Sequence, residues 1–142
     1  MKVILDTNVL LSAFFKTDSP PYKLVLAWIE DRFLLVTSFD QIEELVRVYR
    51  YPKVRALISP AEVGWLVNRL RDRTILLKKL PVVAVSTDPA DNFLFAMAEA
   101  SGATYLVTGD RSGLLSQIYQ DCNCTAVGGP SQDLNKNHAI KT

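Results

Sequence analysis

Short continuous apolar runs, separated by segments with helical periodicity, constrain the fold of this 142-residue chain more than any other feature. The runs do not alternate between apolar and polar residues. Continuous apolar runs are typical of strands that are buried on both faces of a parallel sheet. The runs predict strands at residues 3–5, 33–36, 82–85 and 105–107, with a weaker fifth strand near 124–127.

The segments between the runs predict helices over residues 8–15, 22–30, 39–49, 61–79, 89–100 and 112–120. Two of the helix starts carry the capping-box pattern, Ser38 with Gln41 and Ser59 with Glu62. The resulting order is βααβααβαβαβ. This order predicts an α/β fold of three layers (αβα), with a central, mostly parallel sheet of four to five strands and right-handed crossovers.

Length and composition are those of one ordinary globular domain, which we expect over residues 1–127. Residues 128–142 begin Gly-Gly-Pro-Ser, lack periodicity and are expected to form a flexible tail. The formal net charge of +1 means that binding to a nucleic acid would need a local basic patch. No apolar run is long enough for a membrane span or a signal peptide, so we expect a cytoplasmic protein without membrane association.

Cysteine and histidine usage excludes several kinds of catalytic site. Cys122 and Cys124 would point to opposite faces of a strand, which is a poor geometry for a mutual disulfide. We expect them to be small packing residues in a reducing compartment. The only histidine, His138, lies in the expected tail, so nucleophilic sites that need a positioned imidazole are disfavoured. Catalysis in this chain would therefore use carboxylates.

Acidic residues follow each of the four main predicted strands. Ligands of open parallel sheets bind beyond the carboxyl ends of the strands. Four connections at that edge each bring a carboxylate: Asp6, Glu43 or Glu44, Asp88 or Asp91, and Asp110. Carboxylates that converge repel one another unless they share a cation, and Mg²⁺ or Mn²⁺ prefers such oxygen ligands.

Each acid also has a purely structural explanation. Asp6 and Asp88 could cap helices, Asp91 would suit a helix N-terminus, and Asp110 could be a turn residue. Neighbours on a helix diverge by about 100°, so only one of the two adjacent glutamates can face the sheet edge. The convergence of the acids therefore carries more weight than any one of them.

The order and spacing of several motifs resemble those of PIN domains. The motifs are Asp-Thr-Asn at residues 6–8, Asp-Asn at 91–92 with Ala98 six residues beyond, and Thr-Gly-Asp at 108–110. Residues 38–45, followed by Tyr-Pro-Lys at 51–53, are similar to a subgroup of VapC-like toxins from toxin–antitoxin pairs. The resemblance covers roughly residues 2–127.

The resemblance implies a Rossmann-like fold and a metal-dependent ribonuclease. It selects Glu44 over Glu43, because the family's second acid is usually followed by Leu, and Asp91 over Asp88, because the third acid begins a D-x-x-x-x-x-x-A helix. The implied catalytic acids are Asp6, Glu44, Asp91 and Asp110, of which Asp6, Asp91 and Asp110 would hold Mg²⁺ or Mn²⁺. The supporting polar residues would be Thr7, Asn8, Ser38 and Thr108, of which Thr7 or Asn8 would orient Asp6 or a metal-bound water.

Expectations about substrate and partners follow from the same resemblance. RNA would be bound by basic residues near the acids, for which the candidates are Arg111, Arg47 and Lys53. PIN toxins typically form homodimers and bind an antitoxin protein. The N-terminal helices carry more large apolar side chains than one small core needs, which fits such an interface. Many relatives carry another acid where Ser112 stands, which leaves one-metal and two-metal catalysis open.

Two other functions were compared with the nuclease hypothesis. The first is a catalytically weak PIN module that binds RNA or protein. The second is a phosphoryl-transfer domain of the receiver or haloacid-dehalogenase kind. The dehalogenase kind needs a second Asp where Asn8 stands, and a receiver needs a Lys where Gly109 and Asp110 stand. The sequence therefore disfavours the phosphoryl-transfer domain. Retention of all four acids argues against the weak module, which stays the alternative to the nuclease.

Overall fold

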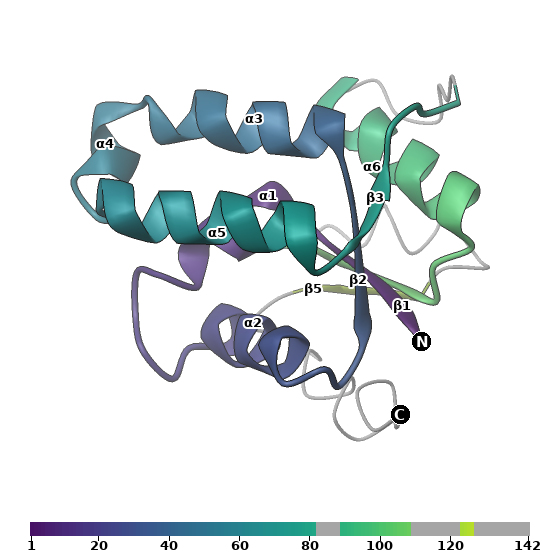
Figure 1. Cartoon of the computed structure of the whole chain (residues 1–142), viewed down its shortest axis with the longest axis horizontal. Helices are drawn as coiled ribbons and strands as arrows, with labels where there is room; N and C mark the ends of the chain where they lie inside the picture. The colour runs from purple at the N-terminus through teal and green to yellow at the C-terminus, as the bar shows by residue number, and fades with distance from the viewer. Residues whose placement is uncertain (82–88, 109–122, 127–142) are drawn as a thin grey trace.

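The structure is a computed structural model that describes residues 1–81, 89–108 and 123–126, with the backbone alone described for 89–92, 108 and 123–126. These residues form the following elements in chain order (Figure 1): β1 (Lys2–Leu5), α1 (Thr7–Ser12), α2 (Pro20–Ile29), β2 (Leu34–Ser38), α3 (Phe39–Tyr49), α4 (Pro52–Arg55), α5 (Pro60–Asp72), β3 (Ile75–Leu77), α6 (Pro89–Ser101), β4 (Tyr105–Thr108) and β5 (Asn123–Ala126).

The sheet has the strand order β3-β2-β1-β4-β5, and all the pairings between neighbours are parallel. The chain first builds outward from β1 through β2 to β3. It then returns to the other side of β1 with β4 and β5. A sheet wound in this way has its switch point between β1 and β4, where a crevice opens at the carboxyl ends of the two strands.

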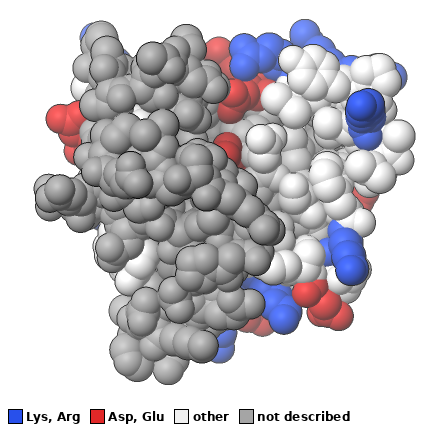
Figure 2. Space-filling view, turned by 180° about the vertical axis from the view of Figure 1, so that it is seen from behind, with Lys and Arg blue, Asp and Glu red and all other residues white. Residues whose placement is uncertain are grey.

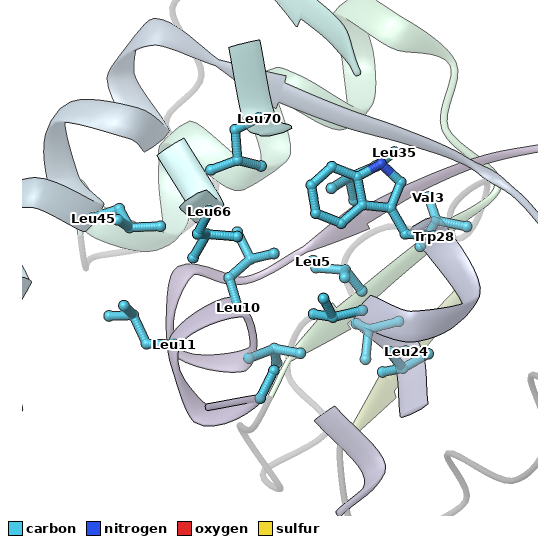
Figure 3. Packing of buried hydrophobic residues seen from close by; sticks show 14 of the residues in the cluster. Val3, Leu5, Leu10, Leu11, Leu24, Trp28, Leu35, Leu45, Leu66 and Leu70 are labelled. Atoms are coloured by element: carbon cyan, nitrogen blue, oxygen red, sulfur yellow. The ribbon is translucent and has the colours of Figure 1, made fainter. Parts of the chain in front are cut away.

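The two faces of the sheet are covered by different helices. Alternate residues of a strand point to opposite faces. Val3 and Leu5 pack with side chains of α1, α2, α3 and α5 in the larger core (Figure 3). Ile4 packs with Phe95 and Met97 of α6 in a second core. Figure 1 shows α6 on the opposite side of the sheet from α2 and α5. The predicted three-layer α/β fold is therefore confirmed.

The prediction of one long helix over residues 61–79 is wrong at its C-terminal end. Helix α5 ends at Asp72, and the Thr74 hydroxyl donates a hydrogen bond to the Leu70 carbonyl there. Residues Ile75–Leu77 form β3 and pair with the last three residues of β2. The β-branched Thr74 and Ile75 lose side-chain freedom in a helix, which favours a strand. The neighbouring strand β2 then supplies the backbone hydrogen bonds that this segment needs.

Several other predicted elements are matched or lie outside the described residues. The predicted strand at 82–85 and the predicted helix at 112–120 lie outside them, as do residues 128–142. The short helix α4 was not predicted from periodicity. The capping box at the start of α5 is confirmed: Ser59 Oγ accepts from Glu62 N at 3.1 Å, and Glu62 Oε1 accepts from Ser59 N at 2.9 Å.

The N-terminal helices leave fewer large apolar side chains exposed than the sequence predicts. Leu10, Leu11 and Trp28 are buried in the larger core, where Trp28 Nε1 also donates to the Arg73 carbonyl at 2.9 Å. Phe15 and Leu26 remain 42% exposed each. Together with α3 and α5 these helices cover one face of the sheet, which takes up most of their apolar side chains. Among the described residues, no helix has the length and apolar character needed to cross a membrane.

Candidate active site

Asp6 lies directly after β1, at the switch point of the sheet. Its backbone N–H donates to the Val107 carbonyl of β4 at 2.9 Å, which fixes Asp6 between the two central strands. Its carboxylate Oδ1 lies 3.5 Å from Asn8 N, beyond the usual range of an N–H···O hydrogen bond. The contribution of Asp6 as a helix cap is therefore small, and its carboxylate stands at the ligand-binding edge.

Glu44 reaches the same place from α3. Its side chain is 15% exposed, whereas the neighbouring Glu43 is an exposed residue. The Thr7 hydroxyl donates to Glu44 Oε2 at 2.7 Å, so Glu44 lies against the residue that follows Asp6. Arg47 Nη2 lies 3.5 Å from Glu44 Oε1. The helix thus turns Glu44, and not Glu43, toward Thr7 and the sheet edge.

Thr7 makes a contact that the resemblance did not imply. The resemblance assigned the orientation of Asp6 or of a metal-bound water to Thr7 or Asn8, and the Thr7 hydroxyl is bonded to Glu44. Thr7 is 2% exposed, so this hydrogen bond is shielded from water on the threonine side. Asn8 is exposed. The structure therefore gives Thr7 a defined task, which is to hold the second acid beside the first.

Replacing Thr7 by Val should destabilise the domain, because it removes a short hydrogen bond to a carboxylate while keeping the shape of the side chain. Such bonds contribute about 1.5–3 kcal/mol, and we expect the lower end because Glu44 is partly exposed. Chemical unfolding of wild type and Thr7→Val would measure the loss. Thr7→Ser is the matched control, since it keeps the hydroxyl; a Thr7→Ser variant as unstable as Thr7→Val would contradict this explanation.

Ser38 ends β2 and begins α3. Its Oγ accepts from Gln41 N at 3.1 Å, which confirms Ser38 as a helix cap. The same Oγ lies 3.3 Å from Met97 Sδ, so Ser38 also contacts α6. The predicted capping box is only half formed, because the Gln41 side chain turns inward and donates to the Leu5 carbonyl. Gln41 was not predicted as part of the site. The neighbouring apolar residues Ile42 and Leu45 indicate in the sequence that this face of the helix is buried.

The other predicted acids are described in part or not at all. Asp91 is in the first turn of α6, where only its backbone is described. The connection from β3 to β4 places this end of α6 at the carboxyl edge of the sheet. Thr108 ends β4 and pairs with Ala126. Asp88, Asp110 and Arg111 lie outside the described residues. Within the described part of the chain, no group of three or more acids, cysteines or histidines gathers at one point.

One of the predicted RNA-binding side chains, Arg47, lies close to a described acid. Arg47 is 66% exposed and pairs with Glu44, and Lys53 is exposed on α4. Near the top of the face shown in Figure 2, basic side chains lie directly beside acidic ones. Because the Arg47 side chain is largely solvated, its pairing with Glu44 contributes little to stability, on the order of 1 kcal/mol. Arg47 can therefore exchange this partner for another anion at little cost.

A parallel sheet wound in the order β3-β2-β1-β4-β5, with an acid at its switch point, defines a Rossmann-like α/β fold, in which ligands generally bind at the carboxyl edge. The sequence model of the PIN domain matches residues 2–112, and the chain belongs to the PIN domain family. No protein with a curated description matches it. PIN domains are generally nucleases and typically use divalent metal ions, so the family indicates a nuclease-type hydrolase.

Proposed function

We propose that this PIN domain is a metal-dependent endoribonuclease that cleaves single-stranded or structured RNA. The observation that carries the proposal is the contact of Glu44 with Thr7, the residue that follows Asp6 at the switch point. Asp6 follows β1, and its neighbour Thr7 holds Glu44 of α3 through a 2.7 Å hydrogen bond. Two carboxylates gathered at one edge repel each other, and a cation that binds both relieves the repulsion.

The donor chemistry of this site fits a hard divalent ion. Carboxylate oxygens, together with waters and phosphate oxygens, are the ligands that Mg²⁺ and Mn²⁺ prefer. In this proposal Asp6, Asp91 and Asp110 hold the ion, and Glu44 is the fourth catalytic acid. When bound, the ion would supply positive charge for a phosphodiester and would lower the pKa of the water that it binds. The single histidine of the chain has no part in this chemistry.

The remaining polar residues hold the acids in place. Thr7 orients Glu44, and Ser38 fixes the start of the helix that carries Glu44. Asn8 and Thr108 support Asp6 and the end of β4 in the proposal. Residues that orient ligands from outside typically change metal affinity or activity 10–100-fold when they are replaced. The acids therefore depend on these neighbours for their geometry.

Binding of the RNA backbone requires positive charge beside the acids. We assign this role to Arg47, Lys53 and Arg111. Arg47 is the best supported of the three, because its guanidinium is exposed and lies 3.5 Å from Glu44. A phosphate at the sheet edge would be within the reach of this side chain. Arg47 would then leave Glu44 and bind the substrate.

The biological setting is proposed from the motifs that resemble toxin subunits. In this setting the chain is a cytoplasmic toxin that forms a homodimer, and an antitoxin protein blocks the acidic edge. Some large apolar side chains are exposed, such as Phe15 at 42% and Leu57 at 55%. An interface with a second protein would bury this apolar surface.

The metal requirement tests the proposed function directly. The purified chain should cleave a fluorescently labelled single-stranded RNA in Mg²⁺ or Mn²⁺. Excess EDTA should stop cleavage, and added Mn²⁺ should restore it, because the carboxylates alone provide neither positive charge nor an activated water. Cleavage that persists in EDTA would refute the metal-dependent mechanism. RNA binding without any cleavage would instead support the weakly catalytic binding module.

A further inference from the structure

We propose that Gln41 is a positioning residue, whose buried side-chain amide sets the place of Glu44 relative to Asp6. The inference rests on the proposed function, because it concerns how the same acids are held. Gln41 lies in the first turn of α3, three residues before Glu44, and its exposed fraction is 0%. A fully buried amide in a helix that is otherwise anchored by apolar side chains requires an explanation.

The Gln41 amide joins the ends of two strands to the helix. Its Nε2 donates to the Leu5 carbonyl of β1 at 2.6 Å. Its Oε1 accepts from the Thr37 hydroxyl of β2 at 2.6 Å. A backbone carbonyl only accepts hydrogen bonds, so the amide must present its NH₂ group to Leu5 and its oxygen to Thr37. The side chain therefore has a single productive orientation.

The bond to Leu5 reaches the peptide group that carries Asp6. The carbonyl of that peptide belongs to Leu5 and is held by Gln41, and its N–H belongs to Asp6 and is held by Val107. The paired residues of β1 and β2 end at Ile4 and Val36. Gln41 supplies a partner for the next carbonyl, where β2 turns away into α3. Both sides of the peptide before Asp6 are thus fixed.

The same amide controls the rotation of α3. Residues three apart on a helix lie on the same face, with about 5–6 Å between their Cβ atoms. If Gln41 is fixed, Glu44 can no longer turn about the helix axis without breaking the bonds of the amide. The apolar contacts of Ile42 and Leu45 hold the helix to the core, but they are not directional. The direction of Glu44 is therefore set by Gln41 and Thr7 together.

The test compares Mn²⁺ affinity, RNA cleavage and thermal stability in the full chain. Gln41→Met keeps the length of the side chain but removes both hydrogen bonds of the amide. We expect its Kd for Mn²⁺ to rise about 10-fold and kcat to fall by a similar factor, with a smaller change in KM for RNA. Thr37→Val removes only the bond that orients the amide. We expect a shift of about threefold in the same quantities.

Ser59→Ala is the matched control. It removes the capping box of α5, so it costs stability on another helix without touching the amide. Electron paramagnetic resonance of Mn²⁺, single-turnover cleavage and melting would be measured on the same samples. The proposal is supported if Gln41→Met and Thr37→Val lose Mn²⁺ affinity while Ser59→Ala keeps it at equal or lower stability.

Two results would overturn the proposal, and they have different meanings. If both amide variants bind Mn²⁺ and cleave like wild type, and only their melting temperatures fall, Gln41 has no positioning role, although the nuclease function stands. If wild type itself neither binds Mn²⁺ nor cleaves RNA, the proposed function fails and the positioning role fails with it. If Gln41→Met shows no cooperative melting, the Mn²⁺ affinity and cleavage of Thr37→Val decide between these outcomes. Valine has nearly the volume of threonine, so this variant should keep the core packed.

Discussion

Asp6→Asn should reduce RNA cleavage by about 10²–10³-fold, the largest effect expected from any change at the site. The amide has the size of the carboxylate but no negative charge, so the site loses a ligand for the divalent ion. An ion that neutralises charge in the transition state contributes several kcal/mol, and each 1.4 kcal/mol or so is a tenfold change in rate. The backbone bond from Asp6 N to Val107 is unaffected by the substitution.

The stability of Asp6→Asn should change much less than its activity. Removing one of two neighbouring negative charges relieves repulsion with Glu44, so we expect the free energy of unfolding to stay within about 1 kcal/mol of wild type or to rise. Initial cleavage rates in Mn²⁺ and urea unfolding curves on the same preparations would check both expectations. A variant that is inactive because it is unfolded would be recognised by its unfolding curve.

Glu43→Gln is the matched control for Asp6→Asn. It also removes one negative charge, but from an exposed side chain next to Glu44. We expect it to cleave RNA within about twofold of wild type, because a solvated charge contributes little. Equal cleavage by wild type and Asp6→Asn would reveal a contaminating nuclease. An equal loss in Asp6→Asn and Glu43→Gln would mean that net charge, and not the ligand, matters.

Trp28→Ala should cause the largest loss of stability. Trp28 is 2% exposed, lies in the larger core beneath β1 and β2 (Figure 3), and donates from Nε1 to the Arg73 carbonyl after α5. Truncating such a side chain costs about 3–5 kcal/mol through lost burial and the cavity left behind. Since a typical domain is stable by only about 5–15 kcal/mol, a large part of the variant should be unfolded at moderate temperature.

Trp65→Ala provides the comparison, because Trp65 is the other tryptophan of the chain and is 36% exposed. It makes an edge contact with Phe14 at 6.1 Å between ring centroids and lies under Arg69 at 5.6 Å. Aromatic and cation–π contacts at such sites contribute roughly 0.5–1.5 kcal/mol each. Thermal melting of both variants would rank them, and a larger loss in Trp65→Ala would show that the larger core is misassigned.

Several features of the site could be predicted because they depend on local sequence. The run before Asp6 reads as a buried strand, so Asp6 falls at a strand end from the sequence alone. Ser38 is a good helix cap wherever a helix follows, and the structure confirms it. The choice of Glu44 over Glu43 needed the family motif, because helical periodicity excludes one of the two without saying which.

Other features could not be predicted, because their partners are distant in the sequence. The helical pattern of residues 61–79 continues through Ile75–Leu77, yet this segment becomes β3 because the open edge of β2 offers it backbone hydrogen bonds. Gln41 reads as the partner of a capping box. Its actual acceptor is the carbonyl of Leu5, which is 36 residues away in the sequence.

The sequence by itself determined the layers of this protein, since continuous apolar strands between amphipathic helices can be buried only inside a parallel α/β sandwich. It also placed Asp6 directly after the first strand. The tertiary structure alone decided the strand order, and with it the switch point between β1 and β4 where Asp6 stands. It also decided which hydroxyl holds Glu44. The physical reason is that periodicity records burial, whereas a hydrogen bond depends on where two distant segments meet.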